Sequence, residues 1–156
     1  MTLDIHIEQV DEHLMACVAG AVDVASTPLF TRALADAATL LPHTTGMVVD
    51  LRDTTFFGAS GLSALARVAS HGIHTGFSLV VITTRDNFVR RVITLEALTE
   101  ILPVADTVVG AQRVLRARQG ALRMIPAPAQ GPLRSSDRRS RTVPRTPRNP
   151  YDVPHQ

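Results

Sequence analysis

Apolar and polar residues alternate at the start of the chain, which is the pattern of a half-buried β-strand. Leu3, Ile5 and Ile7 occupy every second position, and after a short polar turn an apolar run covers residues 14–19. Two such segments joined by a tight turn are typical of a β-hairpin, and Gly20 is expected to close it. This pattern predicts two antiparallel strands at the beginning of the chain.

The next apolar residues recur at the spacing of an α-helix. Ser26 or Thr27 can cap this helix, Pro28 suits its first turn, and its predicted end lies near Pro42. The residues of its apolar face are Phe30, Ala33, Leu34, Ala37 and Leu41. A helix in this place would connect the hairpin to the next strand.

A buried strand followed by a second helix forms the centre of the pattern. The short apolar segment 47–51 follows Gly46 and is of the kind found in the middle of a sheet. A turn leads from it into a helix that is expected to stop between Gly72 and Gly76. The apolar face of this helix consists of Leu62, Leu65, Ala66, Ala69 and Ile73.

The remaining apolar segments predict a further strand at residues 77–82 and a short helix that Asn87 can cap. The residues expected on the inner side of that helix are Phe88, Val92 and Leu95. Residues 98–102 lead towards a last strand, whose pairing Pro103 limits. A final helix would then present Ala111, Val114 and Leu115 to the core.

Together these elements predict one α/β domain over residues 1–118, with about five strands in a single mixed sheet and about four helices. The β-α-β-α-β-α order after the hairpin requires right-handed crossovers. A chain of 156 residues that is 45% hydrophobic has enough apolar side chain to bury one core.

The composition changes at about residue 119. Residues 1–118 hold 9 Arg against 12 acidic residues, a net charge of −3, whereas residues 119–156 hold 7 Arg against 2 Asp, a net charge of +5. The second segment also contains seven of the ten prolines, so it is expected to be a disordered basic tail. A solvated extension without a role and a docking tail for an acidic partner both remain open.

Composition also bears on location and on partner class. The single cysteine, Cys17, permits no intrachain disulfide and is typical of a reducing compartment. The first residues lack the pattern of a signal peptide, and no apolar run has the length of a membrane span, so a cytoplasmic protein is expected. Aromatic residues make up only 4% of the chain and the basic charge lies in the tail, which argues against direct nucleic-acid binding.

The most informative segment is residues 48–65, VVDLRDTTFFGASGLSAL, where an apolar strand leads through a short loop into a helix that begins at Ser60-Gly61-Leu62. It resembles the signature of the STAS family, the sulfate transporter and anti-sigma factor antagonist domains. Residues 18–23, VAGAVD, look like the strand-ending Gly-x-x-Asp of that family, and residues 87–98 are similar to its third helix. The resemblance covers about residues 3–117 and implies a STAS-like fold.

In the antagonist branch of this family, the serine corresponding to Ser60 is phosphorylated by a partner that is both anti-sigma factor and serine kinase. The resemblance implies that the unmodified chain binds such a partner and frees a sigma factor, that phosphorylation ends the binding, and that a phosphatase restores it. The loop at residues 53–63 and the Asp23 turn would form the contact surface. The expected partner-binding residues are Asp23, Asp53, Thr55, Phe57, Gly58, Ala59, Ser60, Gly61 and Ser63.

The position of Ser60 also suits such a switch on physical grounds. A serine in the first turn of a helix lies beside unpaired backbone N–H groups and the positive end of the helix dipole, so the domain tolerates a phosphate there. The phosphate adds a charge of about −1.5 to −2, which would repel an acidic partner surface. Taken alone, however, a serine at this position favours a simple helix cap, and for Asp23 a bond to the backbone of its own turn is at least as good an interpretation.

Two other functions are weighed against this switch. Gly58-Ala59 stands where the family usually has Asp-Ser, which favours a constitutive scaffold or heteromer subunit that is not phosphorylated. An enzyme with Ser60 as nucleophile finds little support, because Leu62 occupies the second Gly position of the G-x-S-x-G elbow.

His71 and His74 share a helical face without a carboxylate or cysteine neighbour, and no nucleotide-binding motif is present, so no metal or cofactor is expected.

Overall fold

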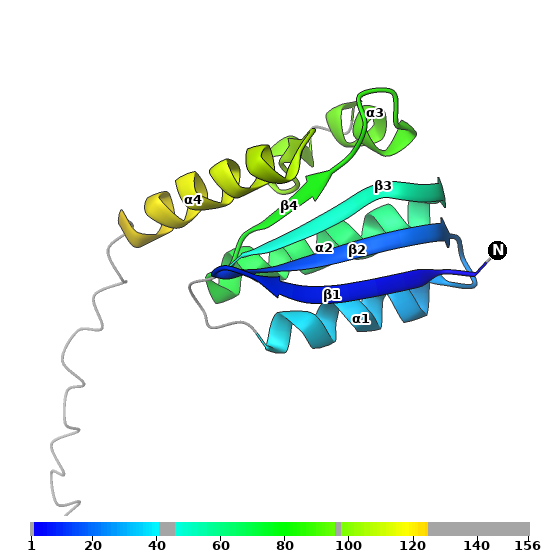
Figure 1. Ribbon diagram of the computed structural model, residues 1–156, viewed down its shortest axis with the longest axis horizontal. Helices are drawn as coiled ribbons and strands as arrows, with labels where there is room; N and C mark the ends of the chain where they lie inside the picture. Colours follow the sequence, from blue (N-terminus) through cyan, green and yellow to red (C-terminus); the bar gives the residue numbers. More distant parts are fainter. Residues whose placement is uncertain (1, 41–45, 96–97, 125–156) are drawn as a thin grey trace, which may run out of the picture. The chain divides into compact units, whose positions relative to one another are not determined.

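The computed structural model describes residues 2–40, 46–95 and 98–124, all within one unit of the chain, Met1–Ile125 (Figure 1). In these ranges five strands and four α-helices follow one another in the predicted order, with one short 3₁₀ helix between the third helix and the last strand. The predicted end of the first helix near Pro42 and the tail from residue 125 onward lie outside the described residues.

The strands form a single mixed sheet. They are β1 (Asp4–Val10), β2 (His13–Val22), β3 (Met47–Phe57), β4 (Leu79–Ile82) and β5 (Val104–Ala105). Their spatial order is β1-β2-β3-β4-β5; β1 runs antiparallel to β2, and every later pair is parallel. The opening hairpin and the mixed sheet are therefore confirmed.

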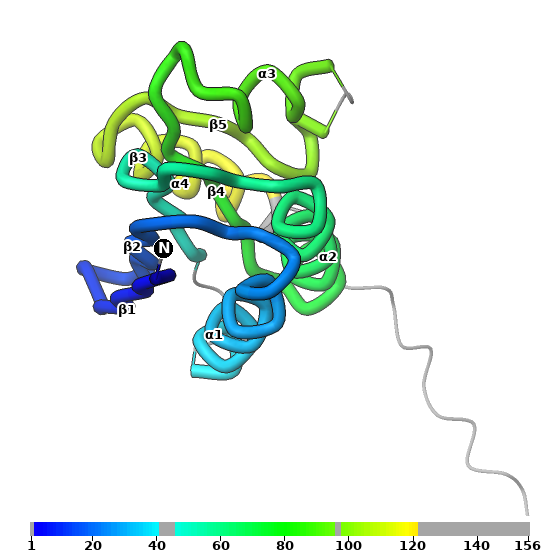
Figure 2. The backbone as a smooth tube through the Cα atoms, turned by 90° about the vertical axis from the view of Figure 1, so that its right-hand side faces the viewer, coloured from blue at the N-terminus to red at the C-terminus, as the bar shows by residue number. Residues whose placement is uncertain are grey.

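Helices cover both faces of the sheet. Figure 2 shows α1 (Thr27–Thr39) beside α2 (Ala59–Thr75), and both pack on one face, whereas α4 (Val108–Met124) packs on the other. The short α3 (Phe88–Leu95) follows β4 and contributes to the same core as α1 and α2. The boundary predicted after residue 118 falls inside α4, because the Gln119–Met124 segment lacks proline and continues the helix.

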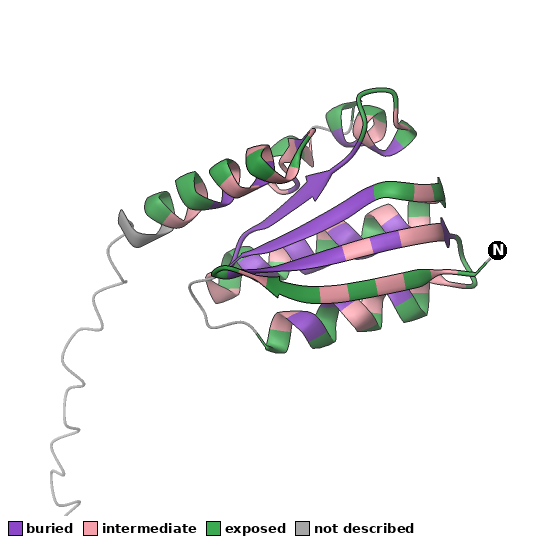
Figure 3. Ribbon diagram, in the orientation of Figure 1, coloured by how far each residue is buried: buried purple, intermediate pink, exposed green. Residues whose placement is uncertain are grey.

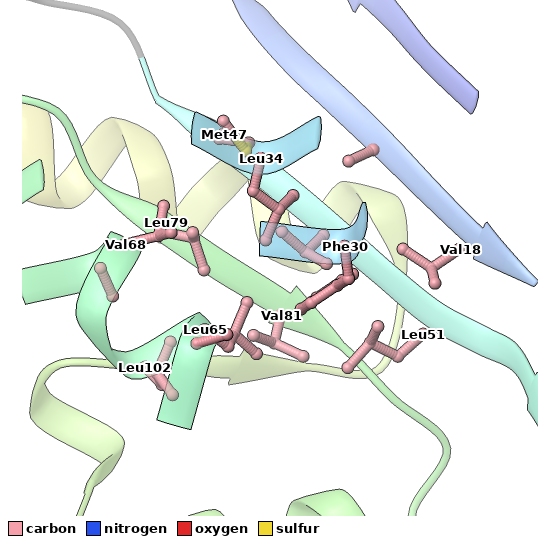
Figure 4. Packing of buried hydrophobic residues seen from close by; sticks show 14 of the residues in the cluster. Val18, Phe30, Leu34, Met47, Leu51, Leu65, Val68, Leu79, Val81 and Leu102 are labelled. Atoms are coloured by element: carbon pink, nitrogen blue, oxygen red, sulfur yellow. The ribbon is translucent and has the colours of Figure 1, made fainter. Parts of the chain in front are cut away.

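The core is mainly but not wholly aliphatic, because Phe30, Phe57 and Phe77 are buried in it, and it consists of one apolar layer on each side of the sheet. Figure 3 shows β4 and the first half of β3 buried, with the outer strand β1 alternating between exposed and half-buried positions. Burial on both faces explains the continuous apolar runs of β3 and β4. The layer between the sheet and α1 and α2 includes Val18, Phe30, Leu34, Leu51 and Leu65 (Figure 4).

Two strands are longer than predicted. β2 continues through Gly20, which has a φ of +92°, and β3 continues beyond Leu51 to Phe57. A Cβ at position 20 would lie only 2.2 Å from the backbone oxygen of Thr2. β2 can therefore lie this close to the start of the chain only because residue 20 is a glycine. Gly20 therefore does not end β2. The register of β2 against β3 shifts once before Gly20 and once directly after it.

The face of α3 is also different from the prediction. Asn87 caps this helix as expected, since its Oδ1 accepts a hydrogen bond of 2.9 Å from the Val89 amide. However, Val89 and Ile93 are buried, and the predicted inner residues Phe88 and Leu95 are exposed. A helix of eight residues with two apolar stripes does not reveal from its sequence which stripe faces the core. In α2, Ile73 is likewise exposed, where an inner position was predicted.

A buried histidine at the start of β2 makes the stability of the fold depend on pH. Burial lowers the pKa of His13, with a smaller opposing effect of Asp11 and a further lowering by Arg116. Its Nε2 has no hydrogen-bond partner in the part of the chain that the structure describes. The folded state therefore takes up the His13 proton less readily than the unfolded chain does.

We expect the free energy of unfolding to fall as the pH is lowered below about 6.5, where the unfolded chain binds the proton and the folded state resists it. Urea unfolding at about pH 7.5 and about pH 5.5 measures the fall. His13→Leu is expected to reduce this pH dependence, whereas His71→Gln, a change at an exposed site on α2, serves as the control. An equal fall in the His13→Leu variant would show that another group is responsible.

Candidate functional site

The candidate site lies where the parallel strands β2 and β3 end at the same edge of the sheet. Val22 pairs with Phe57 in the register, and the Gly58 amide donates a 2.8 Å hydrogen bond to the Val22 carbonyl. From this point β2 turns towards α1 through Asp23, and β3 enters α2 after a single residue. The Asp23 turn and the start of α2 therefore lie next to each other.

Ser60 occupies the first turn of α2 but does not cap it. The N-cap residue is Gly58, and no side chain makes a capping hydrogen bond there. The half-buried Ser60 instead places its Oγ 2.9 Å from the Oγ1 of Thr27, the first residue of α1. The capping interpretation is therefore wrong, because the serine hydroxyl is directed to a neighbouring helix and not to the backbone of its own.

Asp23 and Ser26 hold the turn between β2 and α1 in a closed conformation. The Ser26 amide donates to Asp23 Oδ1 over 2.8 Å, and the Asp23 amide donates to Ser26 Oγ over 2.9 Å. The Ser26 amide stabilises the carboxylate and so lowers the pKa of Asp23. The interpretation of Asp23 as a turn residue is confirmed, and its charge remains exposed beside the start of α2.

Close packing under the site fixes the direction of α2. The buried ring of Phe57 meets Phe30 of α1 edge to face, with 5.6 Å between the ring centroids. Gly61 is buried against the same ring, and a Cβ there would lie 2.7 Å from Cγ1 of Val22. The first turn of α2 can approach the end of β2 only because position 61 has no side chain.

The predicted loop at residues 53–63 is a strand followed by a helix. Residues 53–57 belong to β3 and residues 59–63 to α2, because pairing with the long β2 extends the strand to the edge of the sheet. Asp53, Thr55, Ala59 and Ser63 are exposed, Gly58 is half-buried, and Gly61 and Phe57 are buried. These two therefore support the site from beneath, because Gly61 has no side chain and Phe57 is only 7% exposed.

The two carboxylates of β3, Asp50 and Asp53, have different surroundings. Asp50 is buried, and its carboxylate is paired with Arg52, whose Nη2 lies 2.6 Å from Oδ2. This pairing raises the pKa of Arg52 further above its usual range. Asp53 lies exposed on the same strand, and no hydrogen bond within the described ranges joins its carboxylate to Ser60. Asp23 and Asp53 thus present exposed negative charge on this part of the molecule.

Sequence reasoning missed three residues at this edge. Thr27 was considered only as a cap of α1, and its contact with Ser60, 33 positions later, leaves no local signal in the sequence. Phe56 and Phe88 are 55% and 67% exposed and line a shallow groove, although strand and helix patterns favour burial of such residues. The groove is lined by Thr54, Thr55, Phe56, Phe57, Asn87, Phe88 and Val89.

The groups around Ser60 bear on whether it could act as a nucleophile. Within the described residues the only side-chain hydrogen bond of Ser60 is the one with the Thr27 hydroxyl, so no imidazole or carboxylate is placed to activate it as a nucleophile. No group of three or more His, Cys, Asp or Glu residues in residues 2–40, 46–95 and 98–124 is arranged to hold a metal ion. None of the helices in these ranges is long and apolar enough to span a membrane.

Comparisons with known proteins agree with the fold. The family model of the STAS domain matches residues 4–111. An anti-sigma factor antagonist from Mycobacterium paratuberculosis is similar in structure, with a TM-score of 0.64 and 27% sequence identity over 74% of this chain and 95% of that chain. No curated protein matches the sequence at a significant level.

Two further solved structures share the fold at lower identity. The anti-sigma factor antagonist SpoIIAA in its unphosphorylated form matches with a TM-score of 0.57 and 16% identity, over 74% of this chain and 96% of that chain. The murine Slc26a9 anion transporter matches with a TM-score of 0.57 and 15% identity, over 70% of this chain but only 18% of that chain. The fold therefore occurs both as a small separate protein and as one part of a transporter.

Adding a methyl group at position 61 is expected to push α2 away from β2. Gly61→Ala should lower the free energy of unfolding by about 1–3 kcal/mol, the usual cost of overpacking, because the new Cβ meets Val22 and Phe57. Gly120→Ala is the control, since a Cβ there meets nothing within 4 Å, and it should leave stability unchanged or raise it by up to about 1 kcal/mol. Urea unfolding of both variants decides; equal stability of Gly61→Ala and the parent would contradict the close packing.

Proposed function

This chain belongs to the STAS domain family, and from that membership we propose that it acts as an anti-sigma factor antagonist. It binds an anti-sigma factor of the serine-kinase type and releases a sigma factor, so that transcription is regulated indirectly and in the cytoplasm. The observation that carries the proposal is the placement of Ser60 at the start of α2, beside the Asp23 turn, in a fold shared with nearly the whole of an anti-sigma factor antagonist.

The proposed partner surface is the sheet edge around Ser60. Phe56 and Phe88 are exposed there, with Val24 of the Asp23 turn 82% exposed. Exposed aromatic side chains are typical anchors of a protein interface, and a polar rim usually surrounds them. The residues that we assign to the rim and to the contact itself are Asp23, Asp53, Thr55, Gly58, Ala59, Ser60 and Ser63, with Phe57 and Gly61 shaping the surface from beneath.

Phosphorylation of Ser60 by the same partner would end the binding. The Ser60 Oγ forms a bond to the γ-phosphorus of ATP, the bond from that phosphorus to the ADP oxygen breaks, and the hydroxyl proton passes to a base of the kinase. The unpaired N–H groups at the start of α2 and the helix dipole accommodate the new charge, so the fold survives while the interface is lost. A phosphatase would return the chain to its binding form.

One observation favours a second candidate function. The residues before the serine are Gly58 and Ala59, so the acidic side chain that commonly stands beside the phosphorylation site is missing. This favours a constitutive STAS scaffold or heteromer subunit of a signalling complex, which would use the same surface without phosphorylation. The two candidates differ in whether a negative charge at position 60 controls binding.

Ser60→Ala and Ser60→Asp are expected to behave oppositely. Ser60→Ala loses the hydrogen bond with Thr27, which costs about 0.5–1.5 kcal/mol of folding stability, but it should bind the anti-sigma partner as the parent does. Ser60→Asp places a carboxylate where the helix dipole suits it, so it should fold well. Its affinity for the anti-sigma partner should be at least about tenfold weaker than that of the parent. At the interface the new carboxylate must either lose its water or face a like charge on the partner.

Isothermal titration with the cognate anti-sigma factor measures both affinities, and melting curves of each variant exclude unfolding as the cause. Ser70→Asp is the matched control, because it adds the same charge to the same helix away from the site and should bind as the parent does. If Ser60→Asp and the parent bind equally, Ser60 does not control the interface and the scaffold function takes precedence.

A further inference from the structure

Three consecutive hydrogen-bonding groups connect Ser60 to the turn after β2. The Thr27 hydroxyl donates to the backbone carbonyl of Asp23 over 2.6 Å, and the Ser60 and Thr27 hydroxyl oxygens are 2.9 Å apart. The Thr27 amide donates to the same Asp23 carbonyl over 2.9 Å. Thr27 therefore stands between the proposed modification site and a turn of the proposed partner surface.

The direction of these hydrogen bonds follows from counting hydrogens. A threonine hydroxyl has one hydrogen, and a backbone carbonyl can only accept, so the hydrogen of Thr27 is committed to Asp23. The 2.9 Å contact must then be a bond in which Ser60 donates and Thr27 accepts. The lone pairs of Ser60 Oγ are left to face away from Thr27, which suits a group that is to attack a phosphoryl donor.

Phosphorylation removes the hydroxyl hydrogen that Ser60 donates to Thr27. The ester oxygen of phosphoserine cannot donate, so the oxygens of residues 60 and 27 would face each other as two acceptors at 2.9 Å. The contact becomes favourable again if the Thr27 hydroxyl turns from Asp23 to a phosphate oxygen. The Asp23 carbonyl keeps the Thr27 amide as its donor, so it is not left unpaired.

We propose that Thr27 is the positioning residue of this switch: its hydroxyl fixes the Ser60 hydroxyl in the unmodified protein and transfers its hydrogen bond from Asp23 to the phosphate after modification. This inference rests on the proposed function for its biological meaning. It connects the state of α2 to the β2–α1 turn, where Asp23 and Val24 are exposed to a partner. Phosphorylation would thus alter the β2–α1 turn as well as the start of α2, and not only the residue that carries the charge.

The test uses the full chain with phosphoserine installed at position 60 during synthesis by genetic encoding, so no kinase or partner is needed. Phosphorus NMR follows the second ionisation of the phosphate, whose pKa is ordinarily about 6. A hydrogen bond from Thr27 favours the dianion, so Thr27→Val should raise the titration midpoint by at least about 0.3 pH units relative to the parent phosphoprotein. The nearby Asp23 carboxylate is present in every variant, so its influence cancels in the comparison.

Three variants make the result specific to the hydroxyl. Thr27→Ser keeps the donor and should titrate as the parent does, and Thr31→Val, the same exchange one helical turn later in α1, should do so as well. If valine at position 27 prevents folding, Thr27→Ala removes the hydroxyl with less crowding and should show the same rise. Equal midpoints for the parent and the variants without the hydroxyl, or a rise in Thr27→Ser, would overturn the proposal.

The outcome is separable from that of the proposed function. The titration reads a hydrogen bond inside one chain, so it can succeed even if no anti-sigma kinase modifies Ser60. Conversely, weaker binding of Ser60→Asp to an anti-sigma factor would stand even if the Thr27 hydroxyl did not contact the phosphate.

Discussion

The parallel pairing of β2 with β3 is the constraint on which the site depends. Because the two strands end at the same edge of the sheet, the segments that follow them begin side by side, and the Gly58 amide joins them through the Val22 carbonyl. The absence of a side chain at Gly61 allows α2 to approach this edge, and Phe57 packs against α1 below it. Ser60 and Thr27, which are 33 positions apart in sequence, can therefore share a hydrogen bond.

The surface that results combines a rigid base with small, reactive or charged groups above it. The buried layer of α1, α2 and the sheet fixes the backbone, while the hydroxyl groups, Asp23 and the exposed Phe56 contribute no essential part of the core. Under the proposed function, a charge added at Ser60 would be tolerated by the helix terminus and would change mainly what the surface binds. This division would allow a modification to alter binding without unfolding the domain, which is held together by its buried apolar layers.

Much of the fold could be predicted because its apolar periods are clear. The alternation at Leu3, Ile5 and Ile7 and the continuous run of β4 predict elements that the structure contains. The length of β3 was less predictable, because the strand reaches Phe57 only through its pairing with β2. The orientation of α3 was also less predictable: Phe88 faces outward because the neighbours of a short helix with two apolar stripes decide which stripe is buried. For the site, the motif predicted Ser60 at the start of a helix, but the Thr27 contact arises only from tertiary structure.

We propose that an anti-sigma factor kinase controls this chain through Ser60. Intact-mass spectrometry after incubation with ATP and the anti-sigma kinases encoded in the same genome tests it most directly, with peptide mapping to locate any added group. We expect one phosphate on the parent chain, mapped to Ser60, and none on Ser60→Ala. A parent chain that remains unmodified by every such kinase, or a phosphate mapped to another residue, would contradict it.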